Sequence, residues 1–120
     1  MYQLEFKIMR LPPILSNGSH RTWQTVAGIK RQWQRLAINE ASRNLPSKPL
    51  SKAEAVFIRH SAREPDYDNM VISFKAIRDG LVKAGVLEDD HPRVLKAEYC
   101  WQKSSPKNGY VSVLVKEVEQ

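Results

Sequence analysis

The spacing of apolar residues alternates along the chain between a period of two and a period near 3.6, which requires both strands and helices. Apolar and polar residues alternate from Tyr2 to Ile8, which predicts a half-buried strand that ends before Pro12 and Pro13. From about Thr22 to Asn44, apolar residues recur at helical spacing and predict an amphipathic helix. Its apolar positions are Val26, Ile29, Trp33, Leu36, Ala37 and Ala41.

The same alternation is repeated in the second half of the chain. A short strand is expected from Ala55 to His60, followed by a helix that Asp68 or Asn69 caps and that runs to about Ala84. The buried stripe of this helix is expected to be Met70, Phe74, Ile77 and Leu81, and Gly85 suits the position after its end. Two more strands, Val94 to Trp101 and Tyr110 to Val118, are expected to form a hairpin through a turn at 106–109. The order β-α-β-α-β-β predicts a single α+β domain over residues 1–120, with helices packed on a mostly antiparallel or mixed sheet.

The size and cysteine content of the chain limit its class. A chain of 120 residues is the usual size of one domain, and a single cysteine, Cys100, excludes an internal disulfide. No apolar run reaches the ~18 residues of a membrane span, and the first residues do not resemble a secretory signal. We therefore expect a protein of the reducing cytoplasm with no membrane partner.

Charge is distributed unevenly in this basic chain. Lysine and arginine total 19 and aspartate and glutamate 13, yet residues 64–90 contain seven of the acids and only three of the bases. This segment carries a net charge of −4 within a chain of +6. An acidic centre is unusual in a passive nucleic-acid binder, because carboxylates repel phosphates unless a cation lies between them.

Two pairs of aspartates are the strongest chemical signal. Asp66 and Asp68 are two residues apart and would face one side of an extended segment, while Asp89 and Asp90 follow the expected second helix. That helix would be roughly 24 Å long, so the pairs meet only if the chain folds back or a second subunit contributes one of them. All four are candidate ligands of Mg²⁺, which prefers carboxylate and phosphate oxygens. Lys75, seven residues after Asp68, would lie on the same helix face and stabilise charge on a scissile phosphate.

Less specific interpretations of the same residues remain open. Asp66 and Asp68 also suit a solvated turn with a helix cap, and Asp89 and Asp90 an ordinary surface loop. No EF-hand or zinc spacing is present, and no glycine-rich phosphate loop suggests an organic cofactor. Trp23 and Trp33 are expected in the helix core and not as platforms for base stacking.

The segment from Asp66 to Val94 resembles the RusA family of Holliday junction resolvases. The resemblance is carried by Asp66-Tyr67-Asp68-Asn69, Lys75, Asp79, Leu81, Lys83-Ala84-Gly85 and Asp89-Asp90, with an early Pro12-Pro13 and Ser16-Asn17. It implies a homodimer of mixed α/β fold that uses Mg²⁺ or Mn²⁺ to make paired nicks across a four-way DNA junction. The essential aspartates of the family match Asp66, Asp68 and Asp90, with Asp89 adjacent, and its conserved lysine matches Lys75. The gap from Asn69 to Lys75 is three residues longer than in the best-known members, and the basic run before the first aspartate is reduced to Arg63.

The expected partner is branched DNA held through its phosphates. The candidate contacts are Lys30, Arg31, Arg35, Arg63, Lys103 and Lys107, although a solvated surface explains each of them equally well. Three other functions stay open: a nuclease that cuts flaps or forks, a DNA-binding module without catalysis, and a basic structural protein with no nucleic-acid role.

Overall fold

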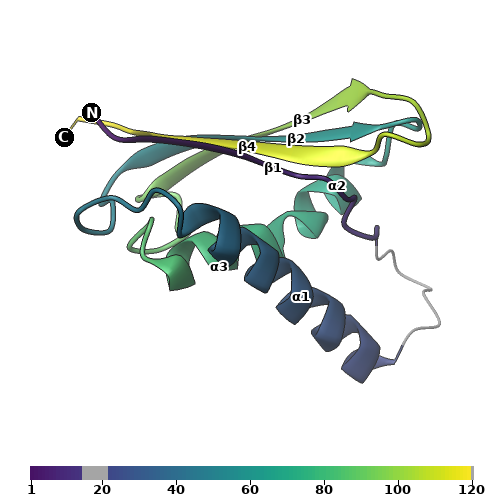
Figure 1. Ribbon diagram of the computed structural model, residues 1–120, viewed down its shortest axis with the longest axis horizontal. Coiled ribbons are helices and arrows are strands. Elements are labelled where there is room, and N and C mark those ends of the chain that lie inside the picture. Colours follow the sequence, from purple (N-terminus) through teal and green to yellow (C-terminus); the bar gives the residue numbers. More distant parts are fainter. Residues whose placement is uncertain (15–21, 120) are drawn as a thin grey trace.

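One mixed β-sheet lies over a layer of helices in the computed structural model, which describes residues 1–14 and 22–119 (Figure 1). The elements are β1 (Gln3–Ile8), α1 (Trp23–Ala41), β2 (Ala53–Ser61), α2 (Tyr67–Ser73), α3 (Lys75–Ala84), β3 (Leu95–Lys103) and β4 (Tyr110–Glu117). The expected α+β domain and its order of strands and helices are confirmed, with one additional break inside the second helix. Within these described residues, no helix is both long and apolar enough to cross a membrane.

The sheet order is β1-β4-β2-β3, with β2 and β3 parallel and the other two pairs antiparallel. The mixed sheet expected from the sequence is therefore confirmed. Alternate residues of each strand face the helices and form the core, which buries Leu4, Phe6, Ile8, Ala53, Ala55, Phe57, Leu95, Val111, Val113 and Val115. The opposite face of the sheet carries no helix of the described chain (Figure 1).

The expected hairpin between the last two strands is wrong. β3 and β4 lie on opposite sides of β2, so the connection at 104–109 passes the end of β2 instead of joining neighbours. The predicted turn at 106–109 is present, but a turn sequence does not specify which strands pair. The pairing follows from burial, because β2 is the strand with most inward residues and takes a central position between two partners.

The first helix begins as expected and packs on α3. The Oγ1 of Thr22 accepts a hydrogen bond from the backbone N–H of Thr25 at 3.2 Å and caps α1. Trp33 is buried as predicted, but Trp23 is 76% exposed, so its expected place in the core is wrong. Trp23 is the first residue of α1, and this end of the helix lies farthest from the sheet (Figure 1).

The second helix is divided in two at Phe74, contrary to the single helix expected from about residue 68 to 84. Phe74 has φ −87° and ψ −5°, and its N–H donates to the carbonyl of Val71, so the α-helical hydrogen bonding is interrupted there. Its ring is fully buried against the stacked rings of Phe57 and Tyr99, with centroid distances of 5.3 and 5.9 Å. Burial of this ring under the sheet accompanies the break, and the expected stripe of Met70, Phe74, Ile77 and Leu81 is nevertheless buried.

Candidate functional site

The first aspartate pair lies at the start of α2. The Oδ1 of Asp66 accepts hydrogen bonds from the backbone N–H groups of Asp68 at 3.0 Å and Asn69 at 3.4 Å. Asp66 is therefore the N-cap, which corrects the expectation that Asp68 or Asn69 would cap this helix. Asp68 lies exposed in the first turn, where its charge is favourable to the helix dipole. No hydrogen bond or ion pair within residues 1–14 and 22–119 occupies the carboxylate of Asp68.

The second aspartate pair is brought back along α3 by the loop that follows this helix. Gly85 ends α3 with φ +91°, a left-handed conformation that glycine adopts without strain. Val86 and Leu87 are then buried, and backbone hydrogen bonds join Leu50 to Val86 and Glu88 on either side of Leu87. This anchoring directs the loop back along α3, which brings Asp90 near the start of the helix.

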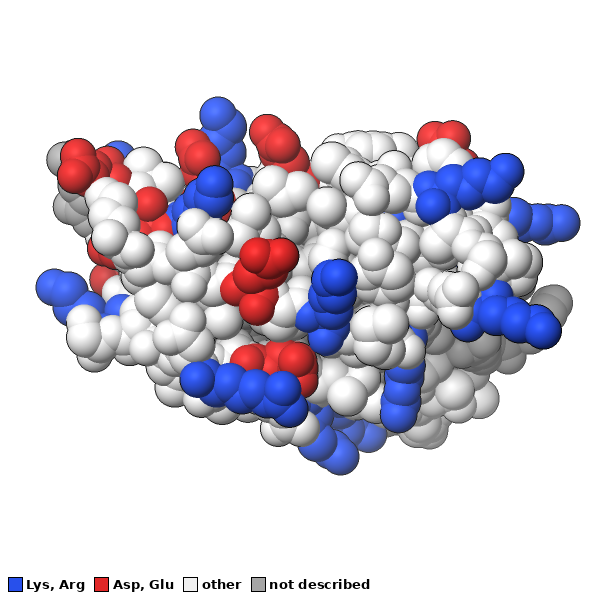
Figure 2. Space-filling view, turned by 45° about the horizontal axis from the view of Figure 1, so that its top comes forward, with Lys and Arg blue, Asp and Glu red and all other residues white. Residues whose placement is uncertain are grey.

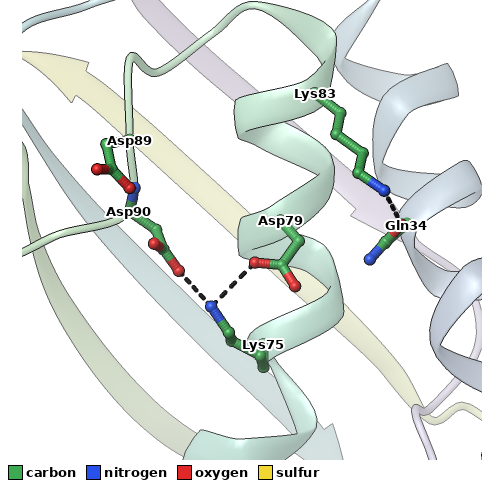
Figure 3. Close-up of polar contacts among 6 residues, drawn as sticks. All are labelled: Gln34, Lys75, Asp79, Lys83, Asp89 and Asp90. Atoms are coloured by element: carbon green, nitrogen blue, oxygen red, sulfur yellow. Dashed lines mark hydrogen bonds and ion pairs between the residues drawn. The ribbon is translucent and has the colours of Figure 1, made fainter. Parts of the chain in front are cut away.

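Lys75, at the first position of α3, forms ion pairs with two carboxylates from different parts of the chain (Figure 3). Its Nζ lies 2.6 Å from Oδ2 of Asp90 and 3.0 Å from Oδ1 of Asp79. Asp89 supports this arrangement, because its Oδ1 accepts a 2.7 Å hydrogen bond from the backbone N–H of Asp90. The helix break at Phe74 places Asp68 in α2 and Lys75 in α3, so the expectation that they belong to one continuous helix is wrong.

The ion pair shifts the pKa values of both partners in the direction that favours charge. The hydrogen bonds that Lys75 donates to Asp90 and then to Asp79 raise the pKa of Lys75. The hydrogen bond from Lys75 is also the main cause that lowers the pKa of Asp90, with the charge of Arg78 contributing. Lys75 is thus held as a cation and Asp90 as an anion across the neutral pH range.

A tyrosine of β3 with a buried hydroxyl lies beside Arg78 of α3. The hydroxyl of Tyr99 is buried and has no hydrogen-bond partner among the described residues, and neither has the Nε of Arg78. Burial raises the pKa of Tyr99, and the charges of Arg78, Tyr67, Asp90 and Lys75 all act on it. Of the four candidate aspartates, Asp90 is among these charges. A buried polar group without a partner is uncommon and is consistent with a site that receives a ligand.

The oxygen donors suit magnesium in kind, although they are not assembled as a complete ligand set. Across residues 1–14 and 22–119, no three histidine, cysteine, aspartate or glutamate side chains are grouped as metal ligands. Asp66 and Asp90 each hold an internal partner, while Asp68 is free of one in this part of the chain. Magnesium typically needs only one or two protein carboxylates beside water and substrate phosphate, so Asp66 and Asp68 fit the chemistry of the ion.

The expected DNA-binding residues are all exposed but are distributed over several elements. Lys30, Arg31 and Arg35 lie on α1, Arg63 in the loop after β2, and Lys103 and Lys107 at the end of β3 and beyond. Lys30 lines the same small hollow as Lys75, together with Ile72. On the face drawn in Figure 2, basic side chains predominate over the half away from the chain termini, and acidic ones over the half that contains them.

Three residues of this site were not assigned a role from the sequence: Arg78, Asp79 and Tyr99. Asp79 follows Lys75 by four residues, and this spacing in an expected helix was sufficient to predict their ion pair. Arg78 and Tyr99 carried no such signal, because they meet through the packing of α3 under β3. The guanidinium carbon of Arg78 lies 5.7 Å from the centre of the Tyr99 ring.

Comparison with known proteins does not identify the chain. No protein-family model matches it, and no curated protein sequence matches it. Among solved structures, it is similar to the GDP-form protofilaments of TubZ from Bacillus thuringiensis serovar israelensis, with 10% identity and a TM-score of 0.44. That alignment covers 94% of this chain and 24% of the TubZ chain, and the similarity is too low to support an argument about function.

Proposed function

We propose that the protein is a magnesium-dependent endonuclease that cuts branched DNA and resolves four-way junctions by paired nicks. The observation that carries the proposal is the position of Lys75. It bonds Asp90 at 2.6 Å at the start of α3, which directly follows the short helix α2 that Asp66 caps, so two charged residues of the RusA-like motif that are 15 positions apart in the chain are in contact. A basic chain whose acids concentrate in this segment suits a cation held between protein carboxylates and DNA phosphate.

In this proposal Asp66 and Asp68 hold Mg²⁺ or Mn²⁺, and Asp89 and Asp90 complete its surroundings. When bound, the metal supplies a nucleophile at neutral pH and neutralises charge on the phosphate. Asp66 retains a second carboxylate oxygen that the helix cap does not use. Lys75, oriented by Asp79 and Asp90, supplies a fixed positive charge for the scissile phosphate.

The paired cuts require two sites related by symmetry. A four-way junction contains strands of like polarity, and a two-fold homodimer presents two identical sites to them. We therefore propose that the working form is a homodimer on branched DNA. The exposed lysines and arginines of α1, the loop after β2 and the end of β3 would hold the arms through phosphate contacts.

Cleavage of a labelled synthetic four-way junction in magnesium, beside a linear duplex of the same sequence, tests the proposal. The wild-type protein is expected to make symmetric nicks in the junction alone. Asp68→Asn is expected to make none, because the amide is a poorer ligand for a hard cation. Glu88→Gln is the matched control, since Glu88 is an exposed carboxylate of the same loop as Asp89 and is expected to leave cutting unchanged. If the wild-type protein cuts flaps or forks but not junctions, the proposed substrate would be wrong and the proposed catalytic residues would be retained.

A second candidate is a DNA-binding module without catalysis. The observation that favours it is that two of the aspartates have internal structural partners, because Asp66 caps α2 and Asp90 bonds Lys75. Tight binding to the junction with no cutting in any divalent metal would establish this alternative. Absence of binding to any DNA would exclude both candidates and favour a structural protein.

A further inference from the structure

Arg59 is a charged residue on the buried face of the sheet. In β2 the inward positions continue from Ala55 and Phe57 to Arg59 and Ser61, so the alternation places a guanidinium where the core ends. Arg59 is only 9% exposed. It pairs with Val111 of β4 and Trp101 of β3, which fixes its backbone in the middle of the sheet.

The charge of Arg59 lacks a counter-ion in the described chain. Its Nη1 donates a 2.8 Å hydrogen bond to the carbonyl of Pro12, a neutral partner. No carboxylate of residues 1–14 and 22–119 lies within ion-pair distance, and the sequence from 15 to 21 contains no acid. Burial lowers the pKa of Arg59, yet an arginine side chain remains protonated. A largely buried cation without an anion is costly unless a ligand supplies the negative charge.

A hollow of about 430 Å³ lies beside this guanidinium. Three segments line it at the end of the sheet away from the chain termini: the residues after β1, the loop from β2 to α2, and the connection from β3 to β4 (Figure 1). The polar side chains that line it are Arg59, Ser61, Arg63, Glu64, Asp66 and Ser105. The hollow therefore extends from a buried cation to the first aspartate of the candidate site.

The walls of this hollow are fixed by specific contacts. The Oγ of Ser61 donates to the carbonyl of Arg63 at 2.8 Å and accepts from Nε1 of Trp101 at 3.0 Å, which holds the loop that carries Arg63. Leu11 lies so close to Gly109 that a Cβ on Gly109 would be 2.5 Å from the Cδ1 of Leu11. The hollow is thus a built feature of the fold at the entry to α2.

We propose that this hollow binds a backbone phosphate of the DNA strand, with the guanidinium of Arg59 as its fixed cation. This inference rests on the proposed function, because it takes the strand to be the one that passes Asp66. Arginine suits the role, since its planar fork matches two phosphate oxygens. Arg63 adds a second positive charge at the rim, while the carboxylates of Glu64 and Asp66 place the bound phosphate on the arginine side of the hollow.

The salt dependence of junction binding tests this site without any need for cleavage. The affinity of a fluorescent four-way junction is measured at several salt concentrations in calcium, for the wild-type protein and for Arg59→Gln, Arg59→Lys and Arg43→Gln. Loss of one phosphate contact reduces the slope of log affinity against log salt by about 1. Arg59→Gln is expected to show this reduction, whereas Arg59→Lys, which keeps the positive charge, is expected to retain most of the wild-type slope. Arg43→Gln removes an exposed arginine that pairs with Glu40, and it is expected to leave the slope unchanged.

Equal slopes for the wild-type protein and folded Arg59→Gln would overturn the site and leave the proposed nuclease intact. A wild-type protein that binds no junction would overturn both. If Arg59→Gln fails to fold, the site is tested by NMR on the wild-type protein. The measured signal is the side-chain Nε–H resonance of Arg59, which is assigned by its loss in Arg59→Lys. A shift on addition of the junction alone supports a strand-bound phosphate, and a shift with inorganic phosphate as well supports a general phosphate site. No shift with either ligand would overturn the proposal.

Discussion

The Nζ of Lys75 lies 2.6 Å from Oδ2 of Asp90, and this contact joins the start of α3 to the loop that follows its end. Lys75 lowers the pKa of Asp90 below its ordinary value of 3.8, so the folded protein binds this proton less readily than the unfolded chain. The contribution of Asp90 to stability is therefore complete above pH 3.8 and is lost as pH falls through the lower, folded pKa. The raised pKa of Lys75 has the opposite sign, so its contribution is complete below 10.5 and is lost as pH rises beyond that value.

Asp90→Asn is accordingly expected to lower the free energy of unfolding at pH 7 by no more than about 1 kcal/mol, because Lys75 is 46% exposed and water screens the pair. Urea unfolding of both proteins from pH 7 to pH 2 measures the effect. The difference between them should shrink below pH 3.8, as Asp90 in the wild-type protein becomes protonated. A difference that stays constant down to pH 2 would show that Asp90 acts through packing or hydrogen bonding and not through its charge.

Asp66 is expected to have a structural role that can be separated from chemistry. Its side chain caps α2 through the N–H groups of Asp68 and Asn69, and asparagine caps helices about as well as aspartate. Asp66→Ala is therefore expected to cost about 1 kcal/mol of unfolding free energy, and Asp66→Asn much less. Urea unfolding measures both.

The same two variants divide the roles of Asp66 in a cleavage assay. Asp66→Asn is expected to abolish junction cutting while it binds the junction as tightly as the wild-type protein or more tightly, because a negative charge beside phosphate is removed. A stable Asp66→Asn protein that cuts at the wild-type rate would restrict Asp66 to the cap.

Two helical glycines are expected to respond in opposite directions to alanine. A Cβ on Gly80 would lie 2.8 Å from the carbonyl oxygen of Gln34 and 2.9 Å from the Cβ of Ala37, so α3 would have to move away from α1. Gly80→Ala is expected to destabilise the protein by about 1–3 kcal/mol through overpacking. Gly28→Ala in α1 is the matched control, because the nearest atom to its Cβ is the flexible end of Arg31 at 3.9 Å.

Gly28→Ala is expected to stabilise the protein by roughly 0.5–1 kcal/mol through helix propensity. Thermal and urea unfolding of the two variants, measured side by side, test the packing of α1 on α3. Equal stabilisation by both substitutions would mean that the helices are further apart than the structure places them.

The periods of apolar residues were sufficient to predict the elements but not their neighbours. The alternation in β1 and the helical spacing of α1 identify the buried face of each, and both faces are buried as expected. The same pattern does not say that β2 separates β3 from β4, because period two specifies a face and not a partner. The break at Phe74 could not be predicted either, because the residues around it keep a helical spacing while the ring of Phe74 packs against Phe57 and Tyr99.

The arrangement of the candidate site residues could be predicted only in part. The sequence placed Asp90 beyond the far end of a helix, and the return of the chain depends on burial of Val86 and Leu87 and on the backbone bonds of this segment to Leu50. Long-range contacts of this kind have no local signature. Arg59 does have a local signature, because an arginine at an inward position of a strand is unusual. The sequence analysis did not single out this residue.

Replacement of magnesium by calcium is expected to support junction binding without cutting. Calcium accepts the same carboxylate and phosphate oxygens, but it takes more ligands at longer distances and does not impose the octahedral geometry of magnesium. Calcium held by the exposed pair Asp66 and Asp68 would therefore still neutralise the repulsion between these carboxylates and phosphate, while the reacting groups would be held less closely. Junction binding and nicking are measured on the same labelled DNA in each metal, with Asp68→Asn as the control that weakens the response to both ions. Nicking in calcium at the rate seen in magnesium would mean that the geometry of the ion does not govern the reaction, and it would leave the charge of Lys75, held by Asp79 and Asp90, as the main electrostatic support of the phosphate.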